Sequence, residues 1–599
     1  MKVADYIAEF LDNKNVSHVF SITGGASAEL NDSILRKDSL VLQYAHNERS
    51  CSFMAEGYSR ISGKPGVCLV TLGPGATNLI TGVTSCWMDS IPQFVISGQS
   101  FLTQTIRKSG LRQLGTQEAD IIPMVSSITK FAVTITSEKD VIDVLEKAWS
   151  VMLDGRPGPV WIEIPSDIQR SEIQVEQRVL HKEIYCGRNK KDPRRADFIE
   201  KVVKSLGEAE KPLIHFGNGV RISGAQQEML RLISITNSPF CLTHNSYDLI
   251  QTSHPLHQGL PGIFGHRFSN FALQNADFYL GIGTRLTLAQ TGYRKKDFAR
   301  NAKTFLVDID KTELEKEHIR VDFGLVSDAK LFMIDLLEAL EHISFDFSRW
   351  VEVCSNWKQR YSIKNEHANF KINGVSPYDL ISEISKNLNS NSTVITDMGT
   401  SYQTTYQGIS LPEGARLQTN TGFASMGWGL PAALGATYAV TNRSVICLTG
   451  DGGLMMSVQE LAFAAHCKSD FKIFIYNNRG YLTLRQTQIA SFGDRITGVD
   501  EHTGLYFPNY KELAESYGIY YILINTSINL KKQVEDLFRV KGPVIIDVIM
   551  DIEQPQAPKA ANRIDETGKP VQSSLEDLWP FLDVDVLEHE MRYANEKIE

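Results

Sequence analysis

The chain has 599 residues, which is more than one hydrophobic core can organise, so roughly three to four domains are expected. Hydrophobic residues make up 42% and charged residues 22% of the sequence, as in ordinary globular proteins. The net charge of −9 favours solubility and argues against nucleic acid as the main partner.

The first residues, MKVADYIAEFLDNKN, carry acids early and no apolar segment, so no signal peptide is expected. No run approaches the roughly 18 apolar residues of a membrane span. The eight cysteines are scattered without a C-x-x-C pair, which is typical of reduced thiols. We therefore expect a cytoplasmic protein that has no membrane partner and acts on small molecules.

In chain order, strand-like runs alternate with helical patterns, which predicts βαβ units and parallel sheets. The first such segment spans 1–170 and closes at GPVWIEIP, and a polar linker follows at 171–195. The second spans 196–345 and the third 365–550, and residues 551–599 form a proline-rich tail expected on the surface. The predicted fold class is therefore α/β, with three doubly wound parallel-sheet domains.

Two polar strand ends in the third segment carry the most specific signal. SVICLTGD ends at Asp451, FKIFIYNN ends at Asn478, and the helical QELAFAAH lies between them. Parallel strands joined by one crossover end at the same edge of a sheet, where α/β proteins bind ligands. The Asp451 carboxylate, the Asn478 amide oxygen and the Gly480 carbonyl suit Mg²⁺, which completes its shell with diphosphate oxygens and water.

The two residues after Asp451 are glycines, Gly452 and Gly453. We expect them to let the main chain approach phosphate groups, whose charge the following helix N-terminus favours. The alternative for the whole stretch is a plain turn, and the paired amides at crossover distance argue against it.

The G-D-G and N-N pair resembles the thiamine-diphosphate (ThDP) binding motif, and the resemblance extends over nearly the whole chain. The chain is similar to the acetohydroxyacid synthase (acetolactate synthase) branch of the ThDP decarboxylase superfamily. The matching pieces are AHNERSCSFMAEGYSRISGKPGVCLVTLGPGATNLITGV, GTQEADIIPMVSSITKFA, RPGPVWIEIPSDIQ and SMGWGLPAALGA. The family order assigns 1–170 as the pyrimidine-binding domain, 196–345 as the middle domain and 365–550 as the diphosphate-binding domain.

The resemblance gives Glu48, in A-H-N-E-R-S, a catalytic role. In this family a carboxylic acid hydrogen-bonds the aminopyrimidine and promotes formation of the cofactor's reactive C2 carbanion. The alternative is a helix N-terminal acid that the dipole favours. Gln117 matches a glutamine pointing at the reacting carbon, and Lys130 falls in the family's I-T-K-F stretch, where a solvated lysine is an equal alternative.

The resemblance also implies how the cofactor is held. Met426 matches the apolar buttress that bends the cofactor, with ordinary core packing as the alternative, and the Ala424 carbonyl would accept from the aminopyrimidine. The other matched positions are Pro74 and Asn78 beside the pyrimidine, Gly399, Thr400 and Ser401 at the diphosphate, and Gly480, Tyr481 and Leu482 after the paired amides.

In the family the two halves of the site come from different subunits. Glu48 would then face the Asp451–Asn478 pair of a partner chain. A dimer at minimum is implied, and a tetramer is expected.

Three positions depart from acetolactate synthases, because Thr116, Thr487 and Thr400-Ser401 stand where the synthases place Phe, Trp and Gln-His. These changes indicate a roomier, more polar pocket. The segments NNRGYLTLRQTQ and PKAANRIDETGKPVQSSLEDLWPFL resemble a sugar-modifying side branch that includes a yersiniose-type carboligase. The preferred hypothesis is that a 2-oxo acid such as pyruvate is decarboxylated and its acyl carbanion joins a keto sugar. Arg485 and Arg563 are candidates to bind an anionic acceptor, with a structural role as the favoured alternative.

The middle segment contains IHFGNGV, GIGTRL and LVDID, which resemble stretches that contact FAD in the synthases. One interpretation is a structural FAD, and the other is a domain that has lost its nucleotide. The residues implied are Gly217, Gly219, Gly283 and Arg285, with Asp308 and Asp328 near the nucleotide.

Three alternatives stay open for the enzyme: acetolactate synthase proper, a ThDP-dependent 2-oxo acid decarboxylase, and a ThDP-dependent C–C hydrolase. A decarboxylase usually places histidines near the reacting carbon, and His46 alone flanks the thiamine motifs. A regulatory protein on an inactive fold predicts loss of Glu48, Asp451 or Asn478, and all three are present.

Overall fold

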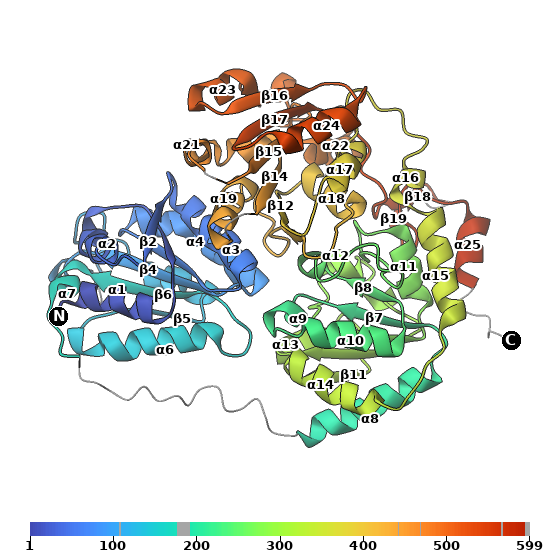
Figure 1. Cartoon of the computed structure of the whole chain (residues 1–599), viewed down its shortest axis with the longest axis horizontal. Coiled ribbons are helices and arrows are strands. Elements are labelled where there is room, and N and C mark those ends of the chain that lie inside the picture. Colours follow the sequence, from blue (N-terminus) through green and yellow to red (C-terminus); the bar gives the residue numbers. More distant parts are fainter. Residues whose placement is uncertain (107–108, 176–191, 441–442, 468, 565–566, 593–599) are drawn as a thin grey trace.

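A computed structural model describes residues 1–106, 109–175, 192–440, 443–467, 469–564 and 567–592 of the chain. The backbone forms three open parallel sheets that follow one another along the sequence, each flanked by helices (Figure 1). This architecture confirms the predicted α/β class with three doubly wound domains. Residues 176–191, most of the expected linker, lie outside the described residues.

The first sheet has the strand order β2-β1-β3-β4-β6-β5. Helices α1 and α6 bury apolar side chains against one face of this sheet, and α3 and α4 cover the other. The strands are β1 (His18–Ser21), β2 (Val41–Tyr44), β3 (Gly66–Val70), β4 (Gln93–Gln99), β5 (Phe131–Thr134) and β6 (Val160–Pro165). The helices are α1 (Val3–Asn13), α2 (Ala28–Leu35), α3 (Glu48–Ser62), α4 (Pro74–Asp89), α5 (Ile121–Val125), α6 (Val141–Leu153) and α7 (Ser166–Arg170).

The second sheet has the order β11-β10-β9-β7-β8. Its strands are β7 (Pro212–Phe216), β8 (Phe240–Leu242), β9 (Phe278–Ile282), β10 (Lys303–Asp308) and β11 (Phe323–Val326). Its helices are α8 (Pro193–Glu208), α9 (Gly219–Ile222), α10 (Gln226–Thr236), α11 (Arg267–Asn275), α12 (Leu288–Thr291), α13 (Lys311–Leu314) and α14 (Ala329–Leu340), and α15 (Ser348–Arg360) and α16 (Ile363–Glu366) lead to the third sheet.

The third sheet has the order β13-β12-β14-β15-β17-β16, which repeats the topology of the first. Its strands are β12 (Ser392–Thr396), β13 (Arg416–Gln418), β14 (Ser444–Gly450), β15 (Phe471–Asn477), β16 (Tyr520–Ile524) and β17 (Val544–Ile549). Its helices are α17 (Pro377–Lys386), α18 (Thr400–Gly408), α19 (Gly429–Ala439), α20 (Asp451–Met455), α21 (Leu461–Ala465), α22 (Leu482–Phe492), α23 (Tyr510–Tyr517) and α24 (Leu530–Arg539). The strand order switches direction between β12 and β14, so the crevice at their carboxyl ends is the expected ligand position.

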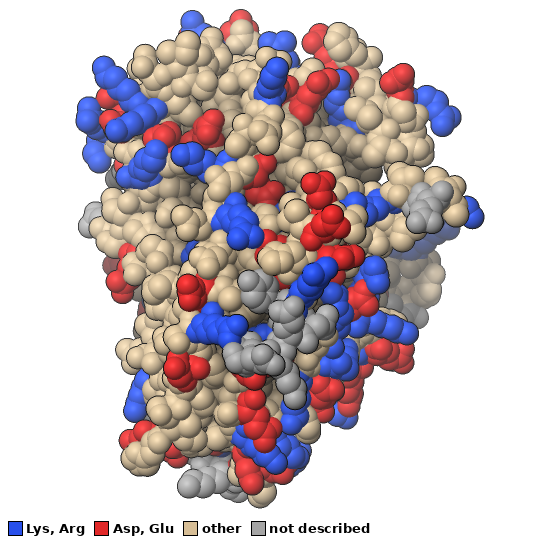
Figure 2. Space-filling view, turned by 90° about the vertical axis from the view of Figure 1, so that its right-hand side faces the viewer, with Lys and Arg blue, Asp and Glu red and all other residues tan. Residues whose placement is uncertain are grey.

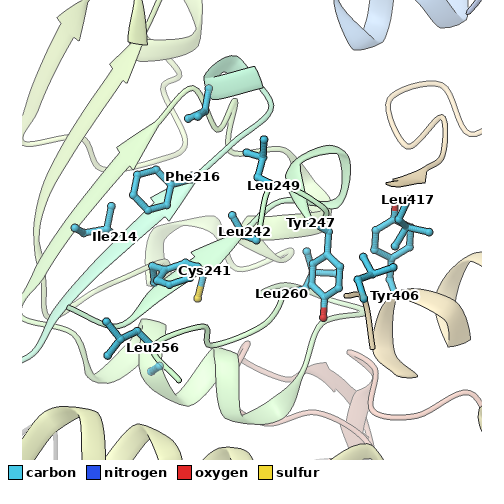
Figure 3. Packing of buried hydrophobic residues seen from close by; sticks show 14 of the residues in the cluster. Ile214, Phe216, Cys241, Leu242, Tyr247, Leu249, Leu256, Leu260, Tyr406 and Leu417 are labelled. Carbon is cyan, nitrogen blue, oxygen red and sulfur yellow. The ribbon is translucent and has the colours of Figure 1, made fainter. Parts of the chain in front are cut away.

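One apolar cluster continues from the middle domain into the third. Figure 3 shows side chains of β7 and β8 continuing through Tyr247 and Leu260 towards Tyr406 of α18 and Leu417 of β13. The rings of Tyr247 and Tyr406 lie 5.7 Å apart in an edge-on contact. The two domains therefore share one core instead of meeting at a polar boundary.

The C-terminal segment is anchored more deeply than a surface tail. It contains β18 (Asn562–Ile564), β19 (Pro570–Gln572) and α25 (Val584–Arg592), and Figure 1 shows α25 beside α15. The Asn270 amide donates to the Leu575 carbonyl at 2.8 Å, and Arg300 pairs with buried Glu576 at 2.8 Å. The tail thus joins the middle and third domains, which differs from the expected surface path.

The described residues contain no helix that is both long and apolar enough to cross a membrane. On the face shown in Figure 2, acidic and basic side chains alternate among the residues that the structure describes, without one extended basic surface. The seven described cysteines are free thiols.

The first and third domains pack through two glycines on facing helices, α3 and α19. A Cβ at Gly57 would lie 2.1 Å from the Ala432 carbonyl oxygen, and one at Gly435 would lie 1.9 Å from the Met54 carbonyl oxygen. Both distances are far below van der Waals contact, so the two backbones touch directly.

We expect Gly435→Ala to lower the thermal unfolding midpoint, because the added methyl must separate α3 from α19 at a cost of about 1–3 kcal/mol. The matched control is Gly207→Ala in α8, where a Cβ meets nothing within 4 Å. That change should leave the midpoint unchanged or raise it slightly, since alanine is the better helix former. Equal midpoints for the two variants, measured by circular dichroism, would contradict the close packing.

Candidate active site

Asp451 lies at the carboxyl end of β14, beside the switch point of the third sheet. Its carboxylate is 2% exposed and accepts hydrogen bonds from the main-chain N–H of Gly452 at 2.7 Å and of Gly480 at 3.0 Å. Burial raises the pKa of Asp451 to about 7. A carboxylate held so far from water is stabilised by a cation, and no ion pair supplies one among the residues described.

Asn478 follows the neighbouring strand, β15, and its amide oxygen is buried without a hydrogen-bond partner. The preceding Asn477 differs, because its amide donates to Asp547 at 2.9 Å. One amide is therefore held by the protein and the other is left unsatisfied. A buried oxygen without a partner is costly, and it is the kind of ligand that Mg²⁺ takes beside a single carboxylate.

The described residues contain no group of three His, Cys, Asp or Glu side chains that could hold a metal ion alone. A metal at Asp451 and Asn478 would therefore depend on oxygens from a bound diphosphate and on water. This donor set fits the Mg²⁺–diphosphate group that the sequence predicts.

The glycines of the G-D-G-G turn are needed for contacts within the chain. A Cβ at Gly452 would lie 1.9 Å from the Tyr481 ring, and one at Gly453 would lie 2.6 Å from the Asp397 carboxylate. The Tyr481 ring and the Asp397 carboxylate therefore require glycine at these two positions, and the approach of the main chain to phosphate stays a prediction. Leu482, the next residue after Tyr481, begins α22 and is buried.

Asp397 is a site residue that the sequence analysis missed. It follows β12, is fully buried, and accepts from the N–H groups of Met398 and Gly427 at 2.8 and 3.1 Å and from the Thr449 hydroxyl at 3.1 Å. Burial raises the pKa of Asp397 to about 6. This carboxyl ties β12 to β14 and to the loop that carries Met426. Its signal was an acid directly after a buried strand, the pattern that identified Asp451.

The other predicted residues of the third domain lie around this carboxyl. Gly399 has φ +92° at the start of α18, where a side chain would be strained. The Ser401 hydroxyl donates to the Asp397 carbonyl at 2.9 Å, and the Thr400 hydroxyl accepts from Gln556 of the tail at 2.7 Å. Ala424 takes a left-handed conformation, with φ +57°, two residues before Met426. Strands β12, β14 and β15 thus bring the predicted diphosphate residues to one edge.

Glu48 and its predicted neighbours gather in the first domain. Glu48 opens α3, is half-buried, and accepts from the Asn78 amide at 3.0 Å. Pro74 opens α4 behind Gly73, where a Cβ would lie 1.9 Å from the carbonyl oxygen of exposed Gln117. Among the described residues no hydrogen bond joins Glu48 to the Asp451–Asn478 pair. The chain therefore presents two separate half-sites.

The residues beside Glu48 are held against the third domain of the same chain. The His46 N–H donates to the Glu460 carboxylate at 3.2 Å, and the Arg49 guanidinium donates to the Met456 carbonyl. Lys130 instead donates to the Asp154 carbonyl, and desolvation lowers its pKa, which indicates a structural role and not a solvated lysine.

A cavity of about 430 Å³ lies where the middle domain meets the first and third domains. Gly219, Gly283, Arg285, Asp308 and Asp328 all line it, as the sequence predicts for a nucleotide. Gly217 is not among the lining residues, because a Cβ there would lie 1.9 Å from the Gly283 carbonyl oxygen. Gly217 therefore serves close packing between the ends of β7 and β9.

The charged residues that line this cavity differ in how far the chain already balances or hydrogen-bonds their charges. Arg285 lies 3.6 Å from Asp89 and 3.5 Å from Glu313, so its cation is already shared with two acids. Asp328 caps α14 by accepting from the Lys330 N–H at 2.9 Å. Asp308 is buried, which raises its pKa, and it accepts from the Asp310 N–H at 3.0 Å.

Both arginines proposed to bind an anionic acceptor are ion-paired. Arg485 pairs with Asp500 at 2.8 Å, and Arg563 pairs with Asp577 at 2.5 Å. Both therefore fit the structural alternative. Thr487 lies exposed on α22 and donates to the Thr483 carbonyl at 2.9 Å, and Thr116 is exposed in the loop before Gln117.

Family models match all three domains. Residues 1–124 match the N-terminal TPP binding domain of thiamine pyrophosphate enzymes, residues 199–340 match their central domain, and residues 397–548 match their C-terminal TPP binding domain. The chain belongs to the thiamine pyrophosphate (ThDP) enzyme family.

Relatives that match nearly the full length of the chain define a narrower class of enzyme within this family. The acetolactate synthase large subunit of Cyanidium caldarium is 31% identical over 555 residues, covering 91% of this chain and 92% of the relative. A probable acetolactate synthase large subunit of Methanococcus aeolicus is 30% identical over 567 residues, 92% of each chain. The isozyme 1 large subunit of Escherichia coli (strain K12) is 28% identical over 572 residues, 94% of this chain and 97% of the relative. The protein is thus an acetolactate synthase-like, ThDP-dependent enzyme.

We expect the metal-free wild-type protein to lose more stability between pH 5 and pH 8 than the variant Asp451→Asn, which also destroys the metal site. Because the folded-state pKa of Asp451 is raised to about 7, its favourable contribution is complete below the unfolded pKa of about 4 and is lost as pH rises through about 7. An amide does not ionise, but its NH2 group would face one of the two N–H groups from which the carboxylate oxygens accept, so the change between the two pH values is the informative quantity. Thermal midpoints measured at both pH values in a chelating buffer test this expectation. An equal change of midpoint in the two proteins would contradict it.

Proposed function

We propose that the enzyme decarboxylates pyruvate with ThDP and Mg²⁺ and joins the acyl unit to a second pyruvate, which makes acetolactate. The unsatisfied oxygen of Asn478 beside the desolvated Asp451 carboxylate carries the proposal, since this pair suits a metal–diphosphate anchor. The names of the full-length relatives support acetolactate as the product.

Bound ThDP would supply a carbanion and an electron sink, which is the chemistry that a 2-oxo acid needs to lose CO₂. Asp451, Asn478 and the Gly480 carbonyl would hold the metal, while Gly399, Thr400 and Ser401, at the start of α18, would contact the diphosphate. The left-handed turn at Ala424 precedes Met426, which would be the apolar buttress of the cofactor. Asp397 would act as a positioning residue, because it fixes that turn to β14.

Glu48 is the group assigned to proton placement at the aminopyrimidine. Its hydrogen bond from Asn78 orients the carboxyl and leaves its other oxygen available. Gln117, exposed on the same edge, would contact the reacting carbon.

We infer a homodimer or homotetramer, and the separation of the two half-sites supports this inference. Glu48 is half-buried and bonded to Asn78 within the first domain, and Asp451 and Asn478 are enclosed in the third. A second copy of the chain could bring its Glu48 over this pair. The free thiols suit the reducing cytoplasm, where we place the enzyme.

A keto sugar, free or nucleotide-linked, is the second candidate for the acceptor. Thr487 and Thr116 are exposed at positions where acetolactate synthases place bulky aromatic residues, which favours a larger and more polar acceptor than pyruvate. Arg485 and Arg563 are ion-paired within the chain, so neither is a free cation for an anionic sugar acceptor. Acetolactate formation is therefore the first candidate.

The cavity at the middle domain is assigned to the nucleotide part of FAD. Five of the six predicted residues line it, and Gly219 and Gly283 approach so closely that a Cβ at Gly219 would lie 2.8 Å from the Gly283 Cα. Side chains from all three domains complete its wall, so a bound flavin would join them. The flavin would be structural, because decarboxylation and ligation need no redox step.

The product from pyruvate distinguishes the alternatives. With ThDP and Mg²⁺ we expect acetolactate, identified by mass spectrometry. Acetaldehyde alone would indicate the decarboxylase, and a mixed product when a keto-sugar nucleotide is added would indicate the sugar ligase. No reaction with any 2-oxo acid would contradict the proposal.

Replacing Glu48 with Gln should lower turnover by about 10²–10⁴-fold, because the amide cannot place the proton. The affinity for ThDP, measured by calorimetry, should change little. Glu29→Gln, at a surface glutamate that pairs with Lys2 and Arg170, is the matched control and should keep full turnover. Wild-type turnover in Glu48→Gln would remove the catalytic assignment.

Incubation with FAD followed by gel filtration should give protein with the visible absorbance of oxidised flavin. Asp308→Lys, which puts a cation in place of a buried acid on the cavity wall, should prevent retention while circular dichroism stays native. A purified protein that never retains flavin would support the nucleotide-free alternative.

A further inference from the structure

A larger cavity, of about 810 Å³, lies between the middle domain and the helices that lead into the third domain. Its wall includes His257, Phe268, Lys358, Phe370 and Tyr378, and it shares no lining residue with the cavity assigned to FAD. Figure 1 shows α15 and α16, which form part of this wall, rising from the middle domain towards α17 and α18. The volume is in the range that encloses a small organic ligand.

Lys358 brings a cation into this cavity without an acid to neutralise it. Its ammonium donates to the His257 carbonyl at 2.8 Å, and none of the described residues forms an ion pair with it. Three histidines, His254, His257 and His266, lie close enough to experience its positive charge. Burial lowers the pKa of Lys358, as expected for a cation removed from water. Of the three N–H donors of a lysine, two are left for a ligand.

His257 adds an unsatisfied ring nitrogen to this wall. Its side chain is 1% exposed, and its Nε2 atom has no hydrogen-bond partner among the described residues. Phe240 stacks on the ring at 5.3 Å and fixes its orientation. Burial lowers the pKa of His257 to about 3, so the ring is neutral and carries one proton. A ring N–H is hydrogen-bonded to the Thr252 backbone, so the unpartnered Nε2 is left as an acceptor.

The other two histidines of the wall are already satisfied. His266 Nε2 lies 3.0 Å from the Gln407 carbonyl, and His367 Nε2 lies 2.8 Å from the Ala557 carbonyl. Of the polar groups on this wall, Lys358 therefore keeps unused donors, and His257 Nε2 is an unused acceptor.

The rest of the cavity is apolar or weakly charged. Phe268, Phe370 and Tyr378 are among its lining residues, and exposed Lys364 adds a second cation. The charge of Lys386 is balanced by Glu383 at 2.5 Å. Asp379 is the acid on the wall, and it influences His367 rather than Lys358. The Lys358 end is therefore electropositive, and the aromatic lining offers apolar contact to a ring or an alkyl group.

We propose that this cavity binds an organic anion, with its phosphate or carboxylate on Lys358 and its apolar part against the aromatic wall. The site is independent of the thiamine chemistry, because none of its residues belongs to either half-site. It shares α18 with the candidate active site, since Gln407 of this helix lines the cavity and Thr400 begins the helix.

Calorimetric titration of the holoenzyme, saturated with ThDP and Mg²⁺, tests the proposal. Phenyl phosphate and benzoate carry the two candidate anions on the same ring, and phenol is the uncharged control. We expect at least one anion to bind, and phenol to bind at least tenfold more weakly. The tighter of the two anions identifies the ligand as a phosphate ester or a carboxylate. Failure of both anions to bind would overturn the proposal.

Two variants assign the binding to this cavity. Lys358→Met keeps the length of the side chain and removes its charge, and should weaken anion binding about tenfold, as for a lost charged hydrogen bond. His257→Phe keeps a ring stacked on Phe240 and removes a nitrogen that only accepts, and should change the affinity far less than Lys358→Met does. Arg285→Met, in the other cavity, is the matched control and should leave the affinity unchanged.

Thermal unfolding provides a second measurement. Lys358→Met without ligand should unfold at the same or a higher temperature than wild type, because an unpaired buried cation is removed. Phenyl phosphate or benzoate should raise the midpoint of wild type but not that of the variant. Anion binding that survives Lys358→Met but is lost in Arg285→Met would place the ligand in the other cavity and overturn the proposal. If Lys358→Met does not fold, a crystal structure of wild type with phenyl phosphate bound outside this cavity would overturn the proposal.

Discussion

The chain depends on two carboxylates that the third sheet buries at its switch point. Asp451 and Asp397 follow neighbouring strands, β14 and β12, and each is surrounded by main-chain N–H groups or hydroxyls instead of cations. Burial raises both pKa values, to about 7 and about 6. The fold therefore holds negative charge where water is excluded, and a metal bound there would recover the cost. Strain of this kind is typical of a functional site.

The two carboxylates differ in how completely the protein satisfies them. Asp397 is satisfied by Met398, Gly427 and Thr449, so it organises the surrounding chain. Asp451 keeps its bonds to two N–H groups and lies beside an amide oxygen with no partner. The first is saturated with donors from the protein, whereas the second site still lacks a positive partner. That difference distinguishes a positioning acid from a metal ligand.

Buried ion pairs hold the three domains around the cavity assigned to FAD. In the first domain, Arg60 pairs with Asp89 at 2.6 Å, and its carbonyl accepts from Arg416 of the third at 2.9 Å. Arg416 pairs with Asp248 of the middle domain at 2.7 Å, and Asp248 also pairs with Arg221. Buried pairs add little net stability but require one geometry. The network therefore fixes how the domains meet, and Arg60, Asp89 and Arg221 all line the cavity.

The sequence alone determined the features that local order controls. Asp451 and Asn478 end strands one crossover apart, so the parallel sheet had to bring them to the same edge. Glu48 opens a helix after a short strand, and Asn78 lies one turn into the next helix, and the family resemblance of the surrounding sequence implied a role for both. The alternation of strands and helices likewise determined the class and the number of domains.

Only the tertiary structure decided what fills the space beside each residue. Gly452 faces Tyr481 and Gly217 faces Gly283. A sequence motif identifies such a glycine but does not show which residue packs against it. The contact of Gly57 with Ala432, the anchoring of the tail by Asn270, and the pairing of Lys358 with His257 join segments about 100 to 400 positions apart. Such contacts arise from how the three sheets pack, and side-chain patterns within one segment contain no record of a partner so distant in the chain.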